Sequence, residues 1–522
     1  MSANLTSASV TTPIDPAPLV GAVRALVAIA LALGTFMQVL DTSIANVAIP
    51  TIAGNLGVSP DQGTWVITSF AVSNGIAVPL TGWLMQRYGV VRTFVVSVLA
   101  FTAASFLCGI AWSLPSLVVF RVLQGAVSGP MIPGSQALLL SVFPPQRRGT
   151  ALAIWSMTTL IAPIAGPVLG GYISDNWTWP WIFFINLPVG VVSALVCTRF
   201  LARRETPTRK LPIDAVGVGL LVVWVGALQV MLDKGEDLGW FTSSAIVTLG
   251  LVAVIGFLAW LIWELTDRHP IVELALFARR HFAIGTIAFC LGYAAFFGNI
   301  VLMPLWLQTQ LGYSATWAGL VMAPSGLVAL IVSPIVGRLI GRIDARWIAT
   351  VGFLSYAASY FMRAGFTANA SFAAFVMPQL VMGIGMGCFF VGMLAILFDG
   401  LPQQRIPSAS GVSNFARIVA SSFATSITTT LWDRRAAFHQ SRLASSSSAL
   451  SPSLQHAMHG LNALGLNDHA ALAVLNRGLT DQAYLLSALD FFWVSGIVTL
   501  ISLVLVWCVP RPSGTAPVAA AE

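Results

Sequence analysis

The segment GTFMQVLDTSIANVAIP, Gly34 to Pro50, indicates the fold class because it places a carboxylate inside an apolar stretch long enough to cross a bilayer. Read as a helix, it gathers small and polar residues on one stripe: Gly34, Gln38, Asp41, Thr42, Ala45 and Asn46. An Asp at the centre of a span costs roughly 3 kcal/mol, and such acids usually mark ion or substrate pathways. Asp41 is therefore predicted to be functional, and the alternative is a polar packing contact.

The composition agrees with a membrane protein. Of the 522 residues, 57% are apolar and only 9% are charged, with a mean hydropathy of +0.84. Soluble domains average about 25% charged residues. Apolar runs of about 20 residues recur fourteen times, which predicts an all-α integral membrane protein with fourteen transmembrane helices.

The net charge of +7 could suggest nucleic acid, but the basic residues are distributed by topology. Most of the 26 lysines and arginines fall in connections on one side of the expected spans, whereas Arg121 and Arg417 lie inside spans. This asymmetry follows the positive-inside rule and predicts that both termini are cytoplasmic. The excess of lysine and arginine therefore indicates the orientation of the chain in the membrane, and no nucleic-acid partner is predicted.

The expected spans divide into two sets of six with a pair inserted between them. The spacing of Gly82 and Arg87 recurs at Gly337 and Arg342, which suggests two related halves with a substrate site between them. The predicted organisation is a disordered cytoplasmic tail at 1–22, a six-helix half at 23–202, a linker with two extra helices at 203–280, a second six-helix half at 281–510, and a cytoplasmic tail at 511–522.

A second intramembrane charge is predicted to meet Asp41. Arg121 lies about 8 Å below the outer end of its helix, and Asp41 about 13 Å below the end of its own. Because buried charges usually find opposite partners, we expect these two to pair and to couple protons. The alternative is that each faces a wet cavity separately.

A third intramembrane charge, Arg417, lies on a polar face of the thirteenth span. It is expected either to pair with Asp490 or Asp399 or to attract an anionic or polar substrate. The candidate substrate contacts are Gln38, Thr42, Asn46, Gln124, Tyr293, Phe296, Phe297 and Arg417.

Two glycine-rich motifs are predicted to serve packing or gating. Ala162, Gly166 and Gly170 repeat every four residues and permit close helix contact, while Pro167 adds a kink point. The full set of gating and packing candidates is Gly82, Arg87, Gly89, Ala162, Pro163, Gly166, Pro167, Gly170 and Gly171.

The segment 433–481 is the one long loop expected outside the membrane. Its Ser445–Ser448 run indicates a flexible start, whereas Leu454, Met458 and Leu461 recur at helical spacing. Asn467 and Asp468 are positioned to cap a second short helix that reaches Leu475. The loop is expected either to dock a partner or to fold over the outer mouth as a lid.

Five motifs together resemble the major facilitator superfamily, specifically its fourteen-span drug:proton antiporters of the EmrB/QacA type, and most closely the EmrB branch. They are LDTSIANVAIP (Leu40–Pro50), GWLMQRYGVVR (Gly82–Arg92), RVLQGAVSG (Arg121–Gly129), APIAGPVLGG (Ala162–Gly171) and WPWIFFINLPVG (Trp179–Gly190).

The resemblance implies export of hydrophobic toxic compounds from the bacterial inner membrane, driven by the proton-motive force without a cofactor. It also implies a periplasmic adaptor protein and an outer-membrane channel as partners. One departure is that Gln86 stands where the family usually has an acid, so a gating ion pair is not expected there.

Other functions are weakly supported. An ATP-driven pump is excluded, because neither lysine, Lys210 or Lys234, ends a phosphate-binding loop. The sequence contains no HExxH or GxSxG motif that would indicate an enzyme. No metal site is predicted, because His456 and His459 are more simply explained as solvated loop residues. The remaining alternatives are a proton-coupled importer and a non-transporting sensor or scaffold.

Overall fold

The computed structural model describes residues 19–210, 212–267, 270–367, 370–446 and 452–511. Among these residues, ten helices are long and apolar enough to cross a membrane, and the pair α3 (Trp65–Ala77) and α4 (Thr81–Tyr88), bent by 56°, makes an eleventh such segment. Three further helices are also long but less apolar, and they pack within the same bundle: α8 (Arg148–Asn176), α15 (Ala345–Arg363) and α17 (Ile406–Ser446). Every expected span is thus occupied by one helix or by two consecutive helices.

The first half contains α1 (Gly21–Leu56), α3 (Trp65–Ala77), α4 (Thr81–Tyr88), α5 (Val90–Gly109), α6 (Leu114–Ser128), α7 (Met131–Val142), α8 (Arg148–Asn176), α9 (Trp181–Phe184) and α10 (Asn186–Leu201). The inserted pair is α11 (Ala215–Lys234) and α12 (Ser244–Thr266). The second half contains α13 (Arg280–Thr309), α14 (Ala315–Leu339), α15 (Ala345–Arg363), α16 (Phe372–Leu397), α17 (Ile406–Ser446) and α19 (Asp468–Cys508).

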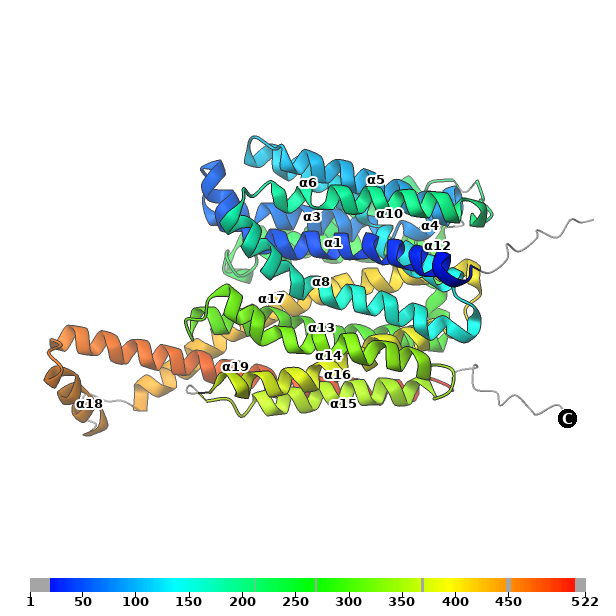
Figure 1. The fold of residues 1–522 in the computed structure, drawn as a ribbon. Coiled ribbons are helices and arrows are strands. Elements are labelled where there is room, and N and C mark those ends of the chain that lie inside the picture. The colour runs from blue at the N-terminus through cyan, green and yellow to red at the C-terminus, as the bar shows by residue number, and fades with distance from the viewer. Residues whose placement is uncertain (1–18, 211, 268–269, 368–369, 447–451, 512–522) are drawn as a thin grey trace, which may run out of the picture.

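The two halves lie side by side, with α8 at their boundary (Figure 1). On one side of this boundary α8 packs against α14 and α16, and elsewhere α11 packs against both α3 and α17. The inserted pair therefore also bridges the halves. The start of α1 and the end of α19 lie on the same side of the molecule, which we name the terminal face, and the opposite side is the far face (Figure 1).

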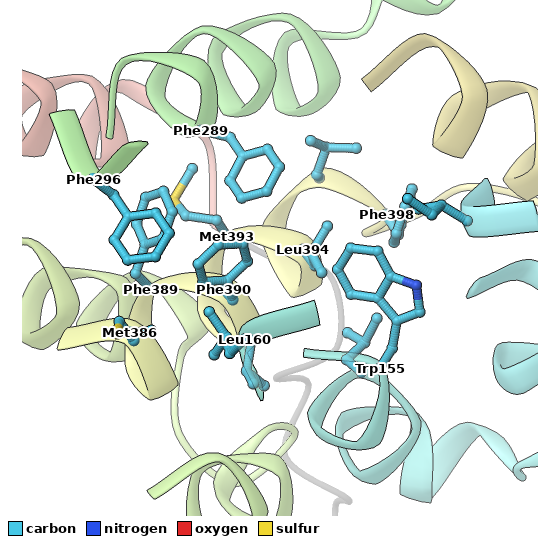
Figure 2. Packing of buried hydrophobic residues seen from close by; sticks show 14 of the residues in the cluster. Trp155, Leu160, Phe289, Phe296, Met386, Phe389, Phe390, Met393, Leu394 and Phe398 are labelled. Atoms are coloured by element: carbon cyan, nitrogen blue, oxygen red, sulfur yellow. The ribbon is translucent and has the colours of Figure 1, made fainter. Parts of the chain in front are cut away.

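The core crosses the boundary between the halves. One buried cluster includes Trp155 and Leu160 of α8 together with Phe289 of α13 and Phe389 of α16. In Figure 2, Leu160 lies beside Phe390, and Trp155 lies beside Leu394 and Phe398 of the second half. The Phe289 and Phe389 rings stack with centroids 5.4 Å apart. Because lipid tails are as apolar as these side chains, tight packing rather than escape from water holds such an interface together.

The expected outer loop is instead a helical hairpin. Both α17 and α19 contain 41 residues, or about 60 Å, twice the hydrocarbon thickness of about 30 Å, so each extends beyond the bundle at the far face. The short helix α18 (Pro452–Ala463) lies at the tip (Figure 1).

The sequence interpretation of this segment was therefore partly wrong. Helix α18 and the Asn467 cap are present, and Asn467 accepts a hydrogen bond from the Ala470 backbone N–H at 2.8 Å. However, the helix expected to end at Leu475 continues through the polar stretch Asn476–Gln482 into the last span, where no proline interrupts it. Ser445 and Ser446 are helical, whereas 447–451, like the tails at 1–18 and 512–522, lie outside the described residues.

Candidate functional site

Asp41 and Arg121 form a buried ion pair in the first half. Arg121 Nη1 lies 2.5 Å from Asp41 Oδ2, and both side chains are fully shielded. The expected contact between α1 and α6 is thus made, while the role of the pair in proton coupling stays a prediction. Breaking one partner of such a pair leaves an uncompensated buried charge, which costs about 3–5 kcal/mol.

Three further side chains complete this network around Asp41. Gln124 and Asn186 donate to Asp41 Oδ1 at 3.1 and 2.9 Å. Both amides also donate to Ser105 Oγ, at 2.7 and 3.2 Å. All five side chains are buried, so four helices, α1, α5, α6 and α10, meet at this one carboxylate.

Arg121 has neutral acceptors in addition to Asp41. Its Nε donates to the Val66 carbonyl at 2.9 Å, and its Nη1 also donates to Gln124 Oε1 at 2.7 Å. The Phe70 ring centroid lies 4.4 Å from the guanidinium carbon, within the range of a cation–π contact. The arginine thus has acceptors other than the Asp41 carboxylate, whereas its Nη2 has no partner among the described residues.

Sequence reasoning missed Ser105 and Asn186. Asn186 lies inside the quoted motif Trp179–Gly190, and an amide within an apolar span is itself a signal of a buried polar contact. Ser105 gives no such signal, since serine is common in membrane helices and satisfies itself locally.

The other candidates on α1 differ in their surroundings. Gln38 is 3% exposed, and its Oε1 has no hydrogen-bond partner. Thr42 donates to the Gln38 carbonyl at 3.3 Å. Asn46 is exposed and lies away from the buried side of the helix, so the stripe as drawn from sequence is correct only over its first turns.

A second polar cluster surrounds Arg417 in the second half. Arg417 Nη2 donates to Asn414 Oδ1 at 2.7 Å, and its guanidinium carbon lies 4.9 Å from the Tyr293 ring centroid and 5.7 Å from that of Trp155. The expected aromatics are adjacent, since the Tyr293 ring lies 6.0 Å from Phe296 and 5.7 Å from Phe297. The structure thus brings four of the predicted substrate residues together.

This cluster also reaches across the boundary between the halves. Gln136 of α7 accepts hydrogen bonds from Ser410 and, at 3.4 Å, from Asn414, both on α17. Two buried donors remain without a partner, Gln136 Nε2 and Arg417 Nε. The cluster therefore offers unused N–H groups from both halves.

The carboxylates expected to pair with Arg417 lie elsewhere. Asp490 pairs with Arg435 at 2.6 Å and with His439 at 2.8 Å, at the base of the hairpin. Among the described residues, no carboxylate pairs with Arg417. Arg363, which the sequence analysis did not single out, is fully buried at the end of α15 and donates to Asn299 of α13.

The motif at Gly82 lies at a close contact between the halves on the terminal face. A Cβ at Gly82 would lie 2.8 Å from Ser408 Oγ, and Gln86 Nε2 donates to the same hydroxyl at 3.1 Å. Gln86 is neutral and makes a hydrogen bond here. No gating ion pair was expected at this position. Arg87 stacks near Trp83, with 5.5 Å between the guanidinium carbon and the ring centroid.

The structure explains why residue 89 is a glycine. Its φ of 92° is a conformation that favours glycine, and a Cβ there would collide with Glu205. The Glu205 carboxylate accepts hydrogen bonds from the backbone N–H groups of Val91 and Arg92, at 3.0 and 2.8 Å, and so caps the start of α5.

The small residues of α8 pack against α1 as the four-residue repeat predicts. A Cβ at Gly166 would collide with the Ser43 side chain and lie 3.1 Å from its carbonyl carbon, and one at Gly170 would lie 3.2 Å from the Ile44 carbonyl oxygen. Ala162 is fully buried, and Ser43 Oγ donates to the Pro163 carbonyl at 3.2 Å.

Gly171 differs from the others in having no atom within 4 Å of an added Cβ. The side chain of Pro167 lies outside the described residues.

A further close approach, missed from sequence, joins α8 to α14 at the terminal face. A Cβ at Gly337 would lie 2.6 Å from the Gly149 carbonyl oxygen and 2.7 Å from the Ala153 Cβ. The backbones of the two halves therefore touch directly here. Together with the Gly82–Ser408 contact, this approach closes the terminal face on two sides.

Two solved structures have the same fold as this chain. The human organic anion transporter MFSD10 (TETRAN) superposes with a TM-score of 0.58 at 12% identity, covering 92% of this chain and 99% of that one. The proton:xylose symporter XylE superposes with a TM-score of 0.56 at 14% identity, covering 94% and 97%.

Relatives by sequence are much more similar. Multidrug export protein EmrB of Escherichia coli (strain K12) is 49% identical over 498 residues, covering 95% of this chain and 97% of that protein. Fatty acid resistance protein FarB of Neisseria gonorrhoeae is 44% identical over 498 residues, covering 95% and 98%. The family model of the Major Facilitator Superfamily matches residues 31–425, and the chain therefore belongs to the major facilitator superfamily.

Proposed function

We propose that this chain is a proton-driven multidrug exporter, with Asp41 as the site that binds the coupling proton. The observation that carries the proposal is the buried network in which Asp41 meets Arg121 and two amides. The high identity to proteins named for multidrug export supports the same function. A transporter of this family needs no cofactor, and the proton-motive force supplies the energy.

The network can exist in two charge states. With Asp41 ionised, its two oxygens accept from Arg121, Gln124 and Asn186. When Asp41 takes up a proton the ion pair is lost, and Arg121 keeps its bonds to the Val66 carbonyl and Gln124 Oε1. Protonation thus weakens the link between α1 and α6, which Gln124 still bridges, and leaves Arg121 with neutral acceptors alone. Because an uncompensated buried charge is costly, this change can be linked to the movement of the two halves.

Transport into proteoliposomes separates this proposal from its rivals. We expect an imposed pH gradient to drive substrate movement opposite to the proton. Movement in the same direction as the proton would indicate an importer, and the absence of any gradient-driven flux would indicate a sensor or scaffold. The test requires only the purified chain and a fluorescent hydrophobic probe.

The Arg417 cluster is the proposed substrate site, and it favours hydrophobic compounds, some of them anionic. Tyr293, Phe296 and Phe297 offer apolar surface, and the unpaired N–H groups of Arg417 and Gln136 are donors for an acidic group. The names of FarB, for fatty acid resistance, and of the organic anion transporter agree with this chemistry. Apolar walls discriminate weakly, so several unrelated compounds should be exported.

Replacing Arg417 with Ala should weaken export of anionic compounds by about tenfold or more, because a hydrogen bond to a charged group contributes about 1.5–3 kcal/mol. Neutral compounds of similar size should be affected little. The measurement is the apparent affinity for matched acid and amide forms of one compound, with Arg417→Lys as the variant that keeps the charge. Equal losses for both forms would assign Arg417 to packing.

We further propose that the terminal face is cytoplasmic and that the chain lies in a bacterial inner membrane. The hairpin of α17, α18 and α19 then extends into the periplasm, where it is the largest surface available to an adaptor protein that leads to an outer-membrane channel. Leu454, Met458 and Leu461 are partly buried, whereas Leu464, Leu472 and Val474 are 80%, 48% and 49% exposed. The second set is therefore the better candidate for adaptor contact.

Changing Leu464, Leu472 and Val474 together to Ser should reduce co-purification of the adaptor and drug resistance in cells, because these exposed side chains lose the apolar area that a partner would cover. Proton-coupled transport in proteoliposomes should be spared. The matched control is the triple change of Leu454, Met458 and Leu461 to Ser, which should loosen α18 itself. Unchanged adaptor binding with a collapsed transport rate would identify the hairpin as a lid.

A further inference from the structure

A groove lies between α1 and α8 in the part of the molecule nearest the terminal face. Its volume is about 530 Å³, and its walls include Ala28, Ala32, Phe36, Ile154 and Ile161. Ile29, on the same wall of α1, is 57% exposed, so the groove opens to the side of the molecule, where lipid lies. It is separate from both polar clusters described above.

One charge stands at the end of this apolar groove. Arg24, in the first turn of α1, lines the groove, and its guanidinium carbon lies 5.3 Å from the Phe143 ring centroid. Among the described residues, no carboxylate pairs with Arg24. Because α1 begins at Gly21 on the terminal face, this cation lies at the level expected for lipid headgroups.

The groove also matches one leaflet in length. From Arg24 to Phe36 the helix rises by about 18 Å, close to the roughly 15 Å that one leaflet contributes to the hydrocarbon core. A dry apolar groove left empty would deprive its walls of packing partners, and water is disfavoured there. An acyl chain is the one apolar molecule present beside it at high concentration.

We propose that this groove binds an anionic phospholipid, with its phosphate on Arg24 and one acyl chain along α1 and α8. A guanidinium and a phosphate form a charge-assisted pair, and a zwitterionic lipid offers the same phosphate with a repelling cation beside it. The site thus prefers lipids of net negative charge. It does not depend on which compounds the protein exports.

The walls of the site belong to the helices that carry the transport machinery. Helix α1 holds Asp41, and α8 makes the Gly149–Gly337 approach to the second half. The lipid therefore lies against α8, the helix that touches the second half at the terminal face. Its occupancy is positioned to affect that contact between the halves.

The test counts lipids bound to the purified full-length chain by native mass spectrometry, using dioleoyl phosphatidylglycerol and dioleoyl phosphatidylcholine, which share acyl chains. We expect tighter binding of phosphatidylglycerol. Arg24→Gln should reduce that preference by about fivefold, the effect of removing one Arg from an anionic surface. Ala32→Trp, which fills the groove, should reduce the binding of both lipids.

Two controls make the result specific. Arg92→Gln removes an exposed cation from the start of α5, and Ala259→Trp adds the same bulk to the partly exposed surface of α12; neither should change lipid binding. Equal losses in Arg24→Gln and Arg92→Gln would overturn the site in favour of general surface charge. Unchanged binding in a folded Ala32→Trp variant, verified by its elution volume and thermal unfolding, would also overturn it.

Discussion

Replacing Asp41 with Asn should abolish export driven by a pH gradient while leaving downhill exchange of substrate measurable. Asn keeps the shape and the hydrogen-bonding oxygen that Arg121 contacts, but it cannot take up and release a proton. One proton moving through about 150 mV releases roughly 3.5 kcal/mol, which supports accumulation of about 300-fold. The variant should lose this accumulation entirely, and tracer efflux from loaded proteoliposomes would measure both properties.

The matched control is Glu264→Gln. Glu264 is also a buried carboxyl, 3% exposed, but it lies on α12, which packs mainly on α11 and is not one of the four helices of the Asp41 network. If neutralising Glu264 stopped coupled export while Asp41→Asn retained it, the proton site would have to be reassigned.

Replacing Gly166 with Ala should cause the second large loss. The added methyl group has to displace the Ser43 side chain and press on its backbone, so α8 must move away from α1 just beside Asp41. Overpacking of this kind costs about 1–3 kcal/mol. We expect a lower unfolding temperature and the loss of most transport, measured on the purified variant.

Gly171→Ala provides an internal comparison within the same motif. Nothing lies within 4 Å of an added Cβ at that position, so the change should be nearly silent. Similar losses in both variants would mean that the motif acts through helix flexibility and not through its contact with α1.

The features that the sequence predicted well are those that the bilayer imposes. A span needs about 20 apolar residues, so helix positions follow from composition alone. Charges inside spans are rare and need partners, and this rule predicts the pairing of Asp41 with Arg121. The four-residue repeat likewise predicted the close face of α8, because small residues are needed wherever two helix backbones approach.

The features that sequence could not predict depend on helix rotation and on regions outside the lipid. The depth of Arg417 was known, but its neighbours Gln136 and Trp155 come from helices whose facing sides only the packed bundle defines. The hairpin was mistaken for a loop because outside the membrane the apolar signal ends while the helix continues. The burial of Arg363 could not be predicted, since a charge near a span end gives no sign that it is buried.

The most direct test of the central claim is whether substrate moves protons through the purified protein. Wild-type protein would be reconstituted into vesicles holding a pH-sensitive dye, with a pH gradient imposed and a hydrophobic substrate then added. The account predicts that substrate accelerates the collapse of the gradient in the wild type and in Glu264→Gln, and that Asp41→Asn shows no acceleration. Substrate-driven proton flux that persists in Asp41→Asn would contradict it.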